Sequence, residues 1–260
     1  MTPSIELKFN HYYAQHCKHL KLKGLQPKTI EAYSRAIRRI AGYFEGHLND
    51  LSQEQLLDYF HDLLQTHSWS AVKLDLYGLK FFYTHVLAKP WVDIPLIKPP
   101  RTTRIPDIVT IDEARQLFLS TRKLSYRVFF FTLYSMGLRL GEGLRLQVGD
   151  IDAERRRVHI RNAKGNKDRL VPLPANTLRV LRRFWNLHRH PTLLFPNRKR
   201  GLKSAYLAES PLDRGGVQVT MAAVVKEMGL KKTFPAIHYA IAMPRICLNR
   251  ASTCWSFNTF

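Results

Sequence analysis

The sequence predicts a mainly α-helical protein with two domains, the second of which contains a small β-hairpin beside its helices. Four segments with helical periodicity precede residue 90. Five prolines then fall within residues 90–108, which excludes a helix interior there and indicates a linker. Further on, residues 157–161 and 169–173 alternate apolar and polar side chains around a turn, as hairpin strands do. We therefore expect a helical domain at 1–89, a linker at 90–108, a mixed domain at 109–233 and a tail of different composition at 234–260.

The net charge narrows the class of partner. Lys and Arg outnumber Asp and Glu by 41 to 20, which gives a formal charge of +21. Such an excess predicts a large polyanionic partner, with double-stranded DNA ahead of an anionic membrane surface. The sequence shows no apolar run of about 18 residues and no signal peptide, so we expect no membrane segment and a cytoplasmic location. Its three cysteines form no CxxC or zinc-like pattern, and we expect neither a metal nor another cofactor.

The first two helices are marked by their ends. Apolar and aromatic side chains recur at helical spacing over residues 5–23, and Gly24 supplies a stop. Pro27 opens a second helix with one apolar face, while basic residues lie elsewhere on it. A basic face can follow a phosphate backbone, but each of its residues can equally be an ordinary solvated side chain. The candidate DNA-binding residues on this helix are Lys28, Arg35, Arg38 and Arg39.

A capping box, Ser52 to Gln55, predicts the start of a third helix, in which Leu56, Leu57, Phe60, Leu63 and Leu64 face inward. A fourth helix is expected over residues 70–87. It carries Gly78, Lys80 and Tyr83, and it could enter a groove of the partner, although the sequence does not decide which face does so. Lys80 is therefore a further DNA-binding candidate.

The second domain opens with another capping box, Thr110 to Glu113. A strongly apolar helix is expected at 125–136, followed by the hairpin and by a helix at 174–188. Residues 193–197 are expected to form a short strand or a turn. A last helix is expected at 217–228, with its apolar positions at Val219, Ala222, Val225 and Met228.

Three residues suit chemistry on a phosphodiester. Arg139 follows Gly137 at an expected helix start, where a guanidinium can form two hydrogen bonds with phosphate oxygens. Glu142 lies three residues on and can hold that arginine in place. Lys164, at the tip of the hairpin, can donate a proton to a leaving 5′ oxygen. Taken singly, an Arg–Glu pair at i, i+3 is more often an ordinary surface pair and a turn lysine is usually solvated.

The order of these parts resembles the tyrosine recombinase, or phage integrase, family, particularly its Xer-like and integron-like members. The motifs are MGLRLGEGLRLQVGDID and AKGNKDRLVPL, which map the family's first catalytic arginine and its supporting acid onto Arg139 and Glu142, and its catalytic lysine onto Lys164. The resemblance implies a SAM-like core-binding domain followed by an integrase catalytic domain. It also implies DNA strand breakage and joining through a phosphotyrosine, without metal or ATP, usually in tetramers on DNA.

The tail departs from the family pattern. The family's H-x-x-R motif, a later His or Trp and the nucleophilic Tyr are all missing: His238 is followed at the arginine position by Ile241, and Tyr239 comes too early. Residues 234–260 contain no Asp, Glu or Lys. Read from the third base of each codon, the tail permits SRHSLRHSYATHLLESGVDLLELQHI, which restores H-S-L-R. We therefore hypothesise a frameshift near codon 234 that leaves the catalytic domain incomplete.

Three hypotheses follow. The first is a recombinase by descent, inactive as given, which still binds DNA and for which tetramer assembly is doubtful. The second is a noncatalytic DNA-binding or regulatory protein that occupies a site with its helical domain. The third is an unstable product whose tail of foreign sequence replaces helices of the core.

Overall fold

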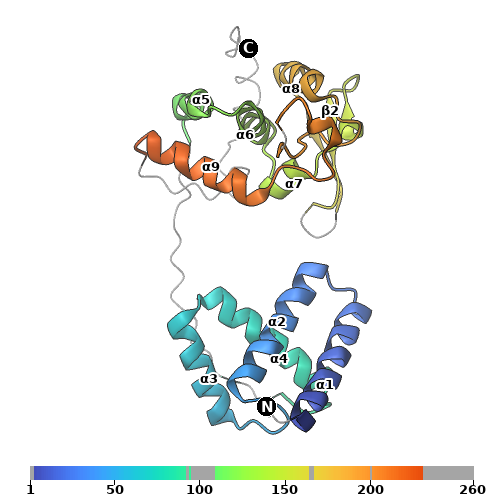
Figure 1. Cartoon of the computed structure of the whole chain (residues 1–260), viewed down its shortest axis with the longest axis vertical. Coiled ribbons are helices and arrows are strands. Elements are labelled where there is room, and N and C mark those ends of the chain that lie inside the picture. Colours follow the sequence, from blue (N-terminus) through green and yellow to red (C-terminus); the bar gives the residue numbers. More distant parts are fainter. Residues whose placement is uncertain (1–2, 92–93, 95–108, 164–166, 200, 231–260) are drawn as a thin grey trace. The chain divides into compact units, whose positions relative to one another are not determined.

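The computed structural model describes residues 3–91, 94, 109–163, 167–199 and 201–230 (Figure 1). The chain divides into two compact units, residues 1–102 and 103–260. Among the described residues, no helix has both the length and the apolar character that crossing a membrane requires. Each unit is mostly helical, as the sequence predicts.

The first unit is built from helices whose ends follow from local sequence. They are α1 (Pro3–Leu22), α2 (Pro27–Tyr43), α3 (Gln53–Thr66) and α4 (Trp69–His85). Gly24 has a φ of +69°, the left-handed conformation that suits a glycine at a helix end. The predicted capping box of α3 is confirmed, because the Ser52 hydroxyl accepts a hydrogen bond from Gln55 N at 3.2 Å and the Gln55 side chain accepts one from Ser52 N at 2.8 Å.

The core of the first unit lies where α2 crosses α4. At Gly78 a Cβ atom would lie 3.1 Å from Ala36 Cβ, so glycine allows the two helices to approach closely. Gly78 and Tyr83 therefore belong to the buried side of α4, and Lys80 is exposed. The inward placement expected for Leu57 is wrong: Leu57 is 39% exposed. The buried stripe of α3 contains Leu56, Tyr59, Phe60 and Leu63, and Leu57 falls beside it on the helical wheel.

The second unit combines helices with a small sheet (Figure 1). Its elements are α5 (Ile111–Ser120), α6 (Leu124–Met136), α7 (Leu140–Leu144), the 3₁₀ turn η1 (Val148–Asp150), β1 (Ile151–Asp152), β2 (Arg157–Ile160), β3 (Arg169–Pro172), α8 (Ala175–His188), the 3₁₀ turn η2 (Ala205–Leu207) and α9 (Arg214–Glu227). The predicted capping box of α5 is present, with Thr110 and Glu113 each accepting a hydrogen bond from the other's N–H.

The sheet has the order β1-β2-β3 and is antiparallel throughout. β2 and β3 are the predicted hairpin strands, with Val158 opposite Val171 and both side chains buried. The strand β1 was not predicted, since two residues are too few to show alternation. Residues 193–197 form isolated bridges at Leu193 and Pro196 in place of a strand.

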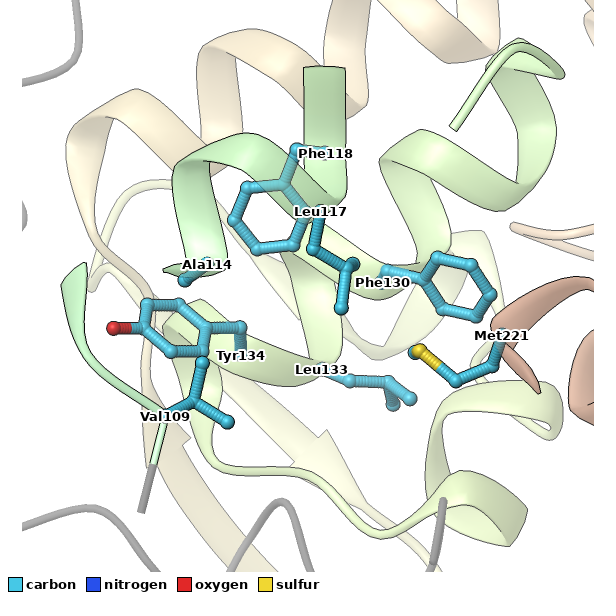
Figure 2. A pocket seen from close by; sticks show the side chains of 8 residues that line it. All are labelled: Val109, Ala114, Leu117, Phe118, Phe130, Leu133, Tyr134 and Met221. Carbon is cyan, nitrogen blue, oxygen red and sulfur yellow. The ribbon is translucent and has the colours of Figure 1, made fainter. Parts of the chain in front are cut away.

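Of the apolar positions expected on the last described helix, Val225 and Met228 are partly buried against the core, whereas Val219 and Ala222 are exposed. Val219 is 70% exposed, and the buried residues of α9 are Val217, Met221 and Val224. Figure 2 shows that the side chain of Met221 lines a small apolar pocket together with residues of α5 and α6. This pocket, of about 10 Å³, is a packing gap of the core rather than a ligand site. Met221 therefore packs beside α5 and α6 and belongs to the buried side of α9.

Candidate phosphate-binding site

A left-handed glycine places Arg139 at the start of a short helix. Gly137 ends α6 with φ +61°, and the N–H groups of Gly137 and Leu138 both donate to the carbonyl of Leu133. This is the hydrogen bonding with which a glycine commonly closes a helix. Leu138 is fully buried, so it fixes the turn in the core. Arg139 follows as the N-cap residue of α7, as the sequence predicts.

A buried carboxylate holds two arginines at this turn. Glu142 Oε1 accepts a hydrogen bond from Arg139 Nη1 at 2.8 Å, and Glu142 Oε2 accepts one from Arg139 N at 2.8 Å. Arg169 Nη2 donates to Glu142 Oε2 at 2.9 Å from the first residue of β3. The Glu142 side chain is 2% exposed, whereas those of Arg139 and Arg169 are 38% and 40% exposed. Each guanidinium is thus held by the carboxylate, while part of each arginine side chain is open to solvent.

The charge state of Glu142 suits this role. Burial on its own would raise the pKa of the carboxyl. The hydrogen bonds from the Arg139 N–H and guanidinium, together with the charges of Arg169 and Arg139, outweigh burial and hold the pKa below its ordinary value. Glu142 is therefore a carboxylate at neutral pH, and it keeps both arginines in position without blocking all of their donors.

Arg169 is the site residue that the sequence reasoning missed. Its strand was predicted correctly, but strand alternation alone does not say which residue of another element a side chain will meet. Asp150 was missed in the same way: it is buried, and its carboxylate accepts from Gln147 N at 2.9 Å and from Arg161 Nε at 2.6 Å. One available signal was the number of basic residues, three of them arginines, in the hairpin and its flanks between residues 157 and 169.

A cavity of about 250 Å³ adjoins the carboxylate. Its lining includes the charged or polar residues Glu142, Arg145, Asp150, His159, Arg161 and Asn162. Its two arginines come from the end of α7 and from the residue after β2, and its apolar lining consists of Leu144, Leu146, Ile160, Leu193 and Pro211. The cavity therefore combines charges of both signs with apolar side chains.

The predicted lysine at the tip of the hairpin, Lys164, lies outside the described residues. The described part of the turn is closed by two hydrogen bonds. Ala163 N donates to Lys167 O at 3.1 Å, and Asn162 N donates to Asp168 Oδ1 at 2.9 Å. Asp168 also bonds His159 Nε2 at 2.8 Å.

The basic residues expected to bind DNA from the first unit differ in their surroundings. Arg35 pairs with Glu31 at 2.6 Å on the surface of α2, and the guanidinium of Arg38 lies 5.5 Å from the ring centroid of Tyr13. Arg39 Nη1 donates to Asp75 Oδ2 at 2.6 Å. Lys28 and Lys80 are exposed. The structure thus brings Arg39 to α4 and Arg38 to α1.

Asp75 is a buried carboxylate of α4 that also accepts from the hydroxyl of Tyr59 at 3.2 Å. Burial raises the pKa of Asp75, and Arg39 and Tyr59 oppose that rise without cancelling it. Arg39 therefore has a structural role in joining α2 to α4, whatever else its exposed atoms contact.

Comparison with known proteins gives a family for both units. Residues 103–239 match the phage integrase family, and residues 12–93 match the phage integrase N-terminal SAM-like domain. Two proteins of Sinorhizobium fredii that carry the name integrase/recombinase are 28% and 31% identical over 187 and 134 residues. The chain spans 60% and 53% of their lengths. A tyrosine recombinase XerA of Thermococcus onnurineus is 28% identical over 78% of this chain and 74% of its own.

Solved structures share the fold. A lambda integrase tetramer bound to a Holliday junction is similar with a TM-score of 0.67, over 88% of this chain and 67% of that chain, at 15% identity. XerH bound to a palindromic difH substrate gives a TM-score of 0.63, over 86% of this chain and 69% of that chain, at 18% identity. At these identities the likeness concerns the fold alone.

Proposed function

This chain belongs to the phage integrase family, and on that premise we propose that it is a site-specific DNA recombinase by descent that binds duplex DNA but does not cleave it as given. The observation that carries the proposal is the buried Glu142 with its two arginines. Arg139 and Arg169 each keep donors open to solvent beside the fixed carboxylate, in the unit that matches the family. Two guanidiniums held in this way are suited to the nonbridging oxygens of a phosphodiester.

The chemistry of the family needs more than this pair. Transfer of a phosphoryl group to a tyrosine requires cations on the nonbridging oxygens, a proton donor for the leaving 5′ oxygen and the nucleophile itself. Arg139 meets the first requirement, with Arg169 beside it, and Lys164 is our candidate for the second. The sequence offers no second arginine in an H-x-x-R context and no tyrosine at the expected place for the third. We infer that the chain as given forms no covalent link to DNA.

A nicked duplex carrying a recombination site tests this inference. Strand cleavage beside the nick would release a short fragment and trap any phosphotyrosyl intermediate, which is visible as a protein–DNA adduct on a denaturing gel. We expect no adduct with the chain as given. An adduct that disappears when one tyrosine is replaced by phenylalanine would overturn the inactivity and identify the nucleophile.

The frameshift hypothesis accounts for the missing residues. The match to the integrase family ends at residue 239, shortly after the composition changes at 234. We propose that one base was lost, or two were gained, near codon 234. Sequencing the gene decides this, because an intact genomic frame with no H-S-L-R reading nearby would refute it. Restoring the frame and recovering recombination would support it.

Binding of duplex DNA does not require strand cleavage, so this part of the proposal is tested separately. The charge of +21 predicts an affinity that falls steeply with salt, measurable by fluorescence anisotropy on a labelled duplex. No tetramer on DNA is proposed for this chain. Specific binding together with a phenotype of the short form would instead favour a noncatalytic regulatory protein, and absence of any duplex binding would refute both readings.

A further inference from the structure

Two more arginines of the second unit meet at one point on the surface of α7. A Cβ atom on Gly141 would lie 3.1 Å from Arg214 Nη2 and 3.3 Å from Arg145 Nη1. The two guanidiniums therefore converge on the space that the glycine leaves empty. Among the described residues, neither arginine forms an ion pair with a carboxylate, although ten other basic residues do so. Two cations held this close repel each other unless an anion lies between them.

The geometry of α7 explains how Arg145 reaches this point. Arg145 follows Gly141 by four residues, and helical side chains point back toward the N-terminus, over the residue one turn earlier. Its Nη2 donates to the carbonyl oxygen of Asn162 at 3.2 Å. That bond fixes one end of the guanidinium on the hairpin and turns Nη1 toward Gly141. A side chain larger than hydrogen at Gly141 would occupy the space between the two guanidiniums.

Arg214 comes to the same point from another element. It is the first residue of α9, which packs against α7 (Figure 1). The Asp213 carboxylate caps this helix by accepting from Gly216 N at 2.6 Å, and Val217 and Met221 are buried in the core. Because α9 is anchored within two turns of its first residue, the position of Arg214 above Gly141 is a property of the fold.

We infer that Arg145 and Arg214 form a second phosphate-binding site over Gly141, separate from the pair that Glu142 holds. Gly141 and Glu142 are adjacent on α7 and so lie about 100° apart around the helix axis. The ligand class is a phosphate group with free nonbridging oxygens, because two guanidiniums without a carboxylate between them match its charge and its oxygens. Resting on the proposed function, we assign this phosphate to the backbone of the bound duplex.

The first arm of the test uses inorganic phosphate and does not depend on DNA binding. Phosphate is titrated into the full chain while the Arg Nε–Hε and Gly141 amide signals are followed by NMR. We expect Arg145, Arg214 and Gly141 to shift together with one saturation curve, and Gly141→Asp, which puts a carboxylate between the guanidiniums, to abolish the shifts. Unchanged signals at these three residues in the wild-type chain would overturn the site.

The second arm measures duplex affinity against salt concentration for the double variant Arg145→Gln/Arg214→Gln. Loss of one phosphate contact should lower the salt slope by about 1 and weaken binding about five- to tenfold near 150 mM salt. The matched control is Arg179→Gln/Arg183→Gln, which removes the same charge from exposed positions of α8 and should leave the slope within about 0.3 of the wild type. Equal losses in both double variants would overturn the assignment to DNA.

The arms separate the two levels of inference. A wild-type chain that binds no duplex but shows the phosphate shifts would refute the proposed function and leave the anion site in place. Thermal unfolding of each variant shows whether the fold is retained. Should the double variant fail to fold, the single exchange Arg214→Gln is measured instead, since this side chain is exposed and its loss should lower the slope by itself.

Discussion

Replacing Glu142 tests the buried ion pairs of the candidate phosphate-binding site. The carboxylate is 2% exposed and accepts three hydrogen bonds from Arg139 and Arg169. Breaking a buried ion pair by removing one partner costs about 3–5 kcal/mol when the remaining charge stays buried. Here the charges left behind are 38% and 40% exposed, so water recovers part of that cost. We expect Glu142→Ala to lower the free energy of unfolding by about 3 kcal/mol.

Glu142→Gln should cost less, about 2 kcal/mol, because the amide oxygen can still accept from Arg139 N while the charge is lost. The assay is urea unfolding of the full chain at pH 7, with the midpoint compared at unchanged m-value. The matched control is Glu227→Gln, whose ion pair with Arg122 at 3.1 Å is exposed on both sides and should be worth less than about 0.5 kcal/mol. A loss for Glu142→Gln no larger than that of the control would refute the reasoning.

The pH dependence gives an independent check on the same residue. The pKa of Glu142 is lower in the folded chain than its ordinary value, so the folded state binds fewer protons than the unfolded state near acidic pH. Its stabilisation is fully present above the ordinary carboxyl range and is lost as pH falls through the folded pKa. The difference in stability between the wild type and Glu142→Gln should therefore shrink as the pH falls from neutral through and below the ordinary carboxyl range. A difference that grows on acidification would contradict the ion pair.

Three further substitutions test the packing and the helix ends. Gly143→Ala should lower the free energy of unfolding by about 1–3 kcal/mol, since its Cβ would lie 2.5 Å from Leu133 Cδ2. The control Gly149→Ala meets nothing within 4 Å and should cost less than about 1 kcal/mol. Equal losses would show that Gly143 is not needed for a close approach. Thr110→Ala should cost about 1 kcal/mol by removing a helix cap, and Thr110→Ser should restore most of it in the same unfolding assay. In the wild type, burial lowers the pKa of His16 to about 4, so the unfolded chain binds more protons than the folded one and the free energy of unfolding falls as the pH drops from about 6.5 to about 4. His16→Phe should remove this loss of stability. An unaltered pH profile of unfolding would count against this reasoning.

How much of this structure the sequence could predict depends on how local each feature is. The capping boxes at Ser52 and Thr110 were predictable because the donor and the acceptor lie three residues apart on the same chain segment. The contact between Arg139 and Glu142 was predictable for the same reason. Arg169 was not, because its bond to Glu142 spans 27 residues and depends on how the sheet packs beside α7.

The prediction of the buried positions of α9 was only partly right, for a related reason. Its sequence carries apolar side chains all round, so periodicity permits more than one buried stripe. The stripe through Val217, Met221 and Val224 is the buried one, and Met221 lines a small pocket together with residues of α5 and α6 (Figure 2). A pattern within one helix cannot contain that information, since the pocket is formed by residues about 100 positions earlier in the chain.

The contacts of the Glu142 site all come from residues between 133 and 169, which lie before the change of composition at 234. Whatever sequence follows residue 233, the turn at Gly137 and the carboxylate that fixes both arginines are set by α6, α7 and β3. This part of the site can therefore fold whether or not the residues after 233 complete the catalytic site. The stability cost of Glu142→Gln should be the same, within about 0.5 kcal/mol, in the chain as given and in a chain with the frame restored. Covalent trapping on a nicked duplex should appear only in a restored chain that continues in frame to the nucleophilic tyrosine. A large difference between the two stability costs would show that the arginines depend on residues after 233, and the separation of binding from cleavage proposed for this chain would then fail.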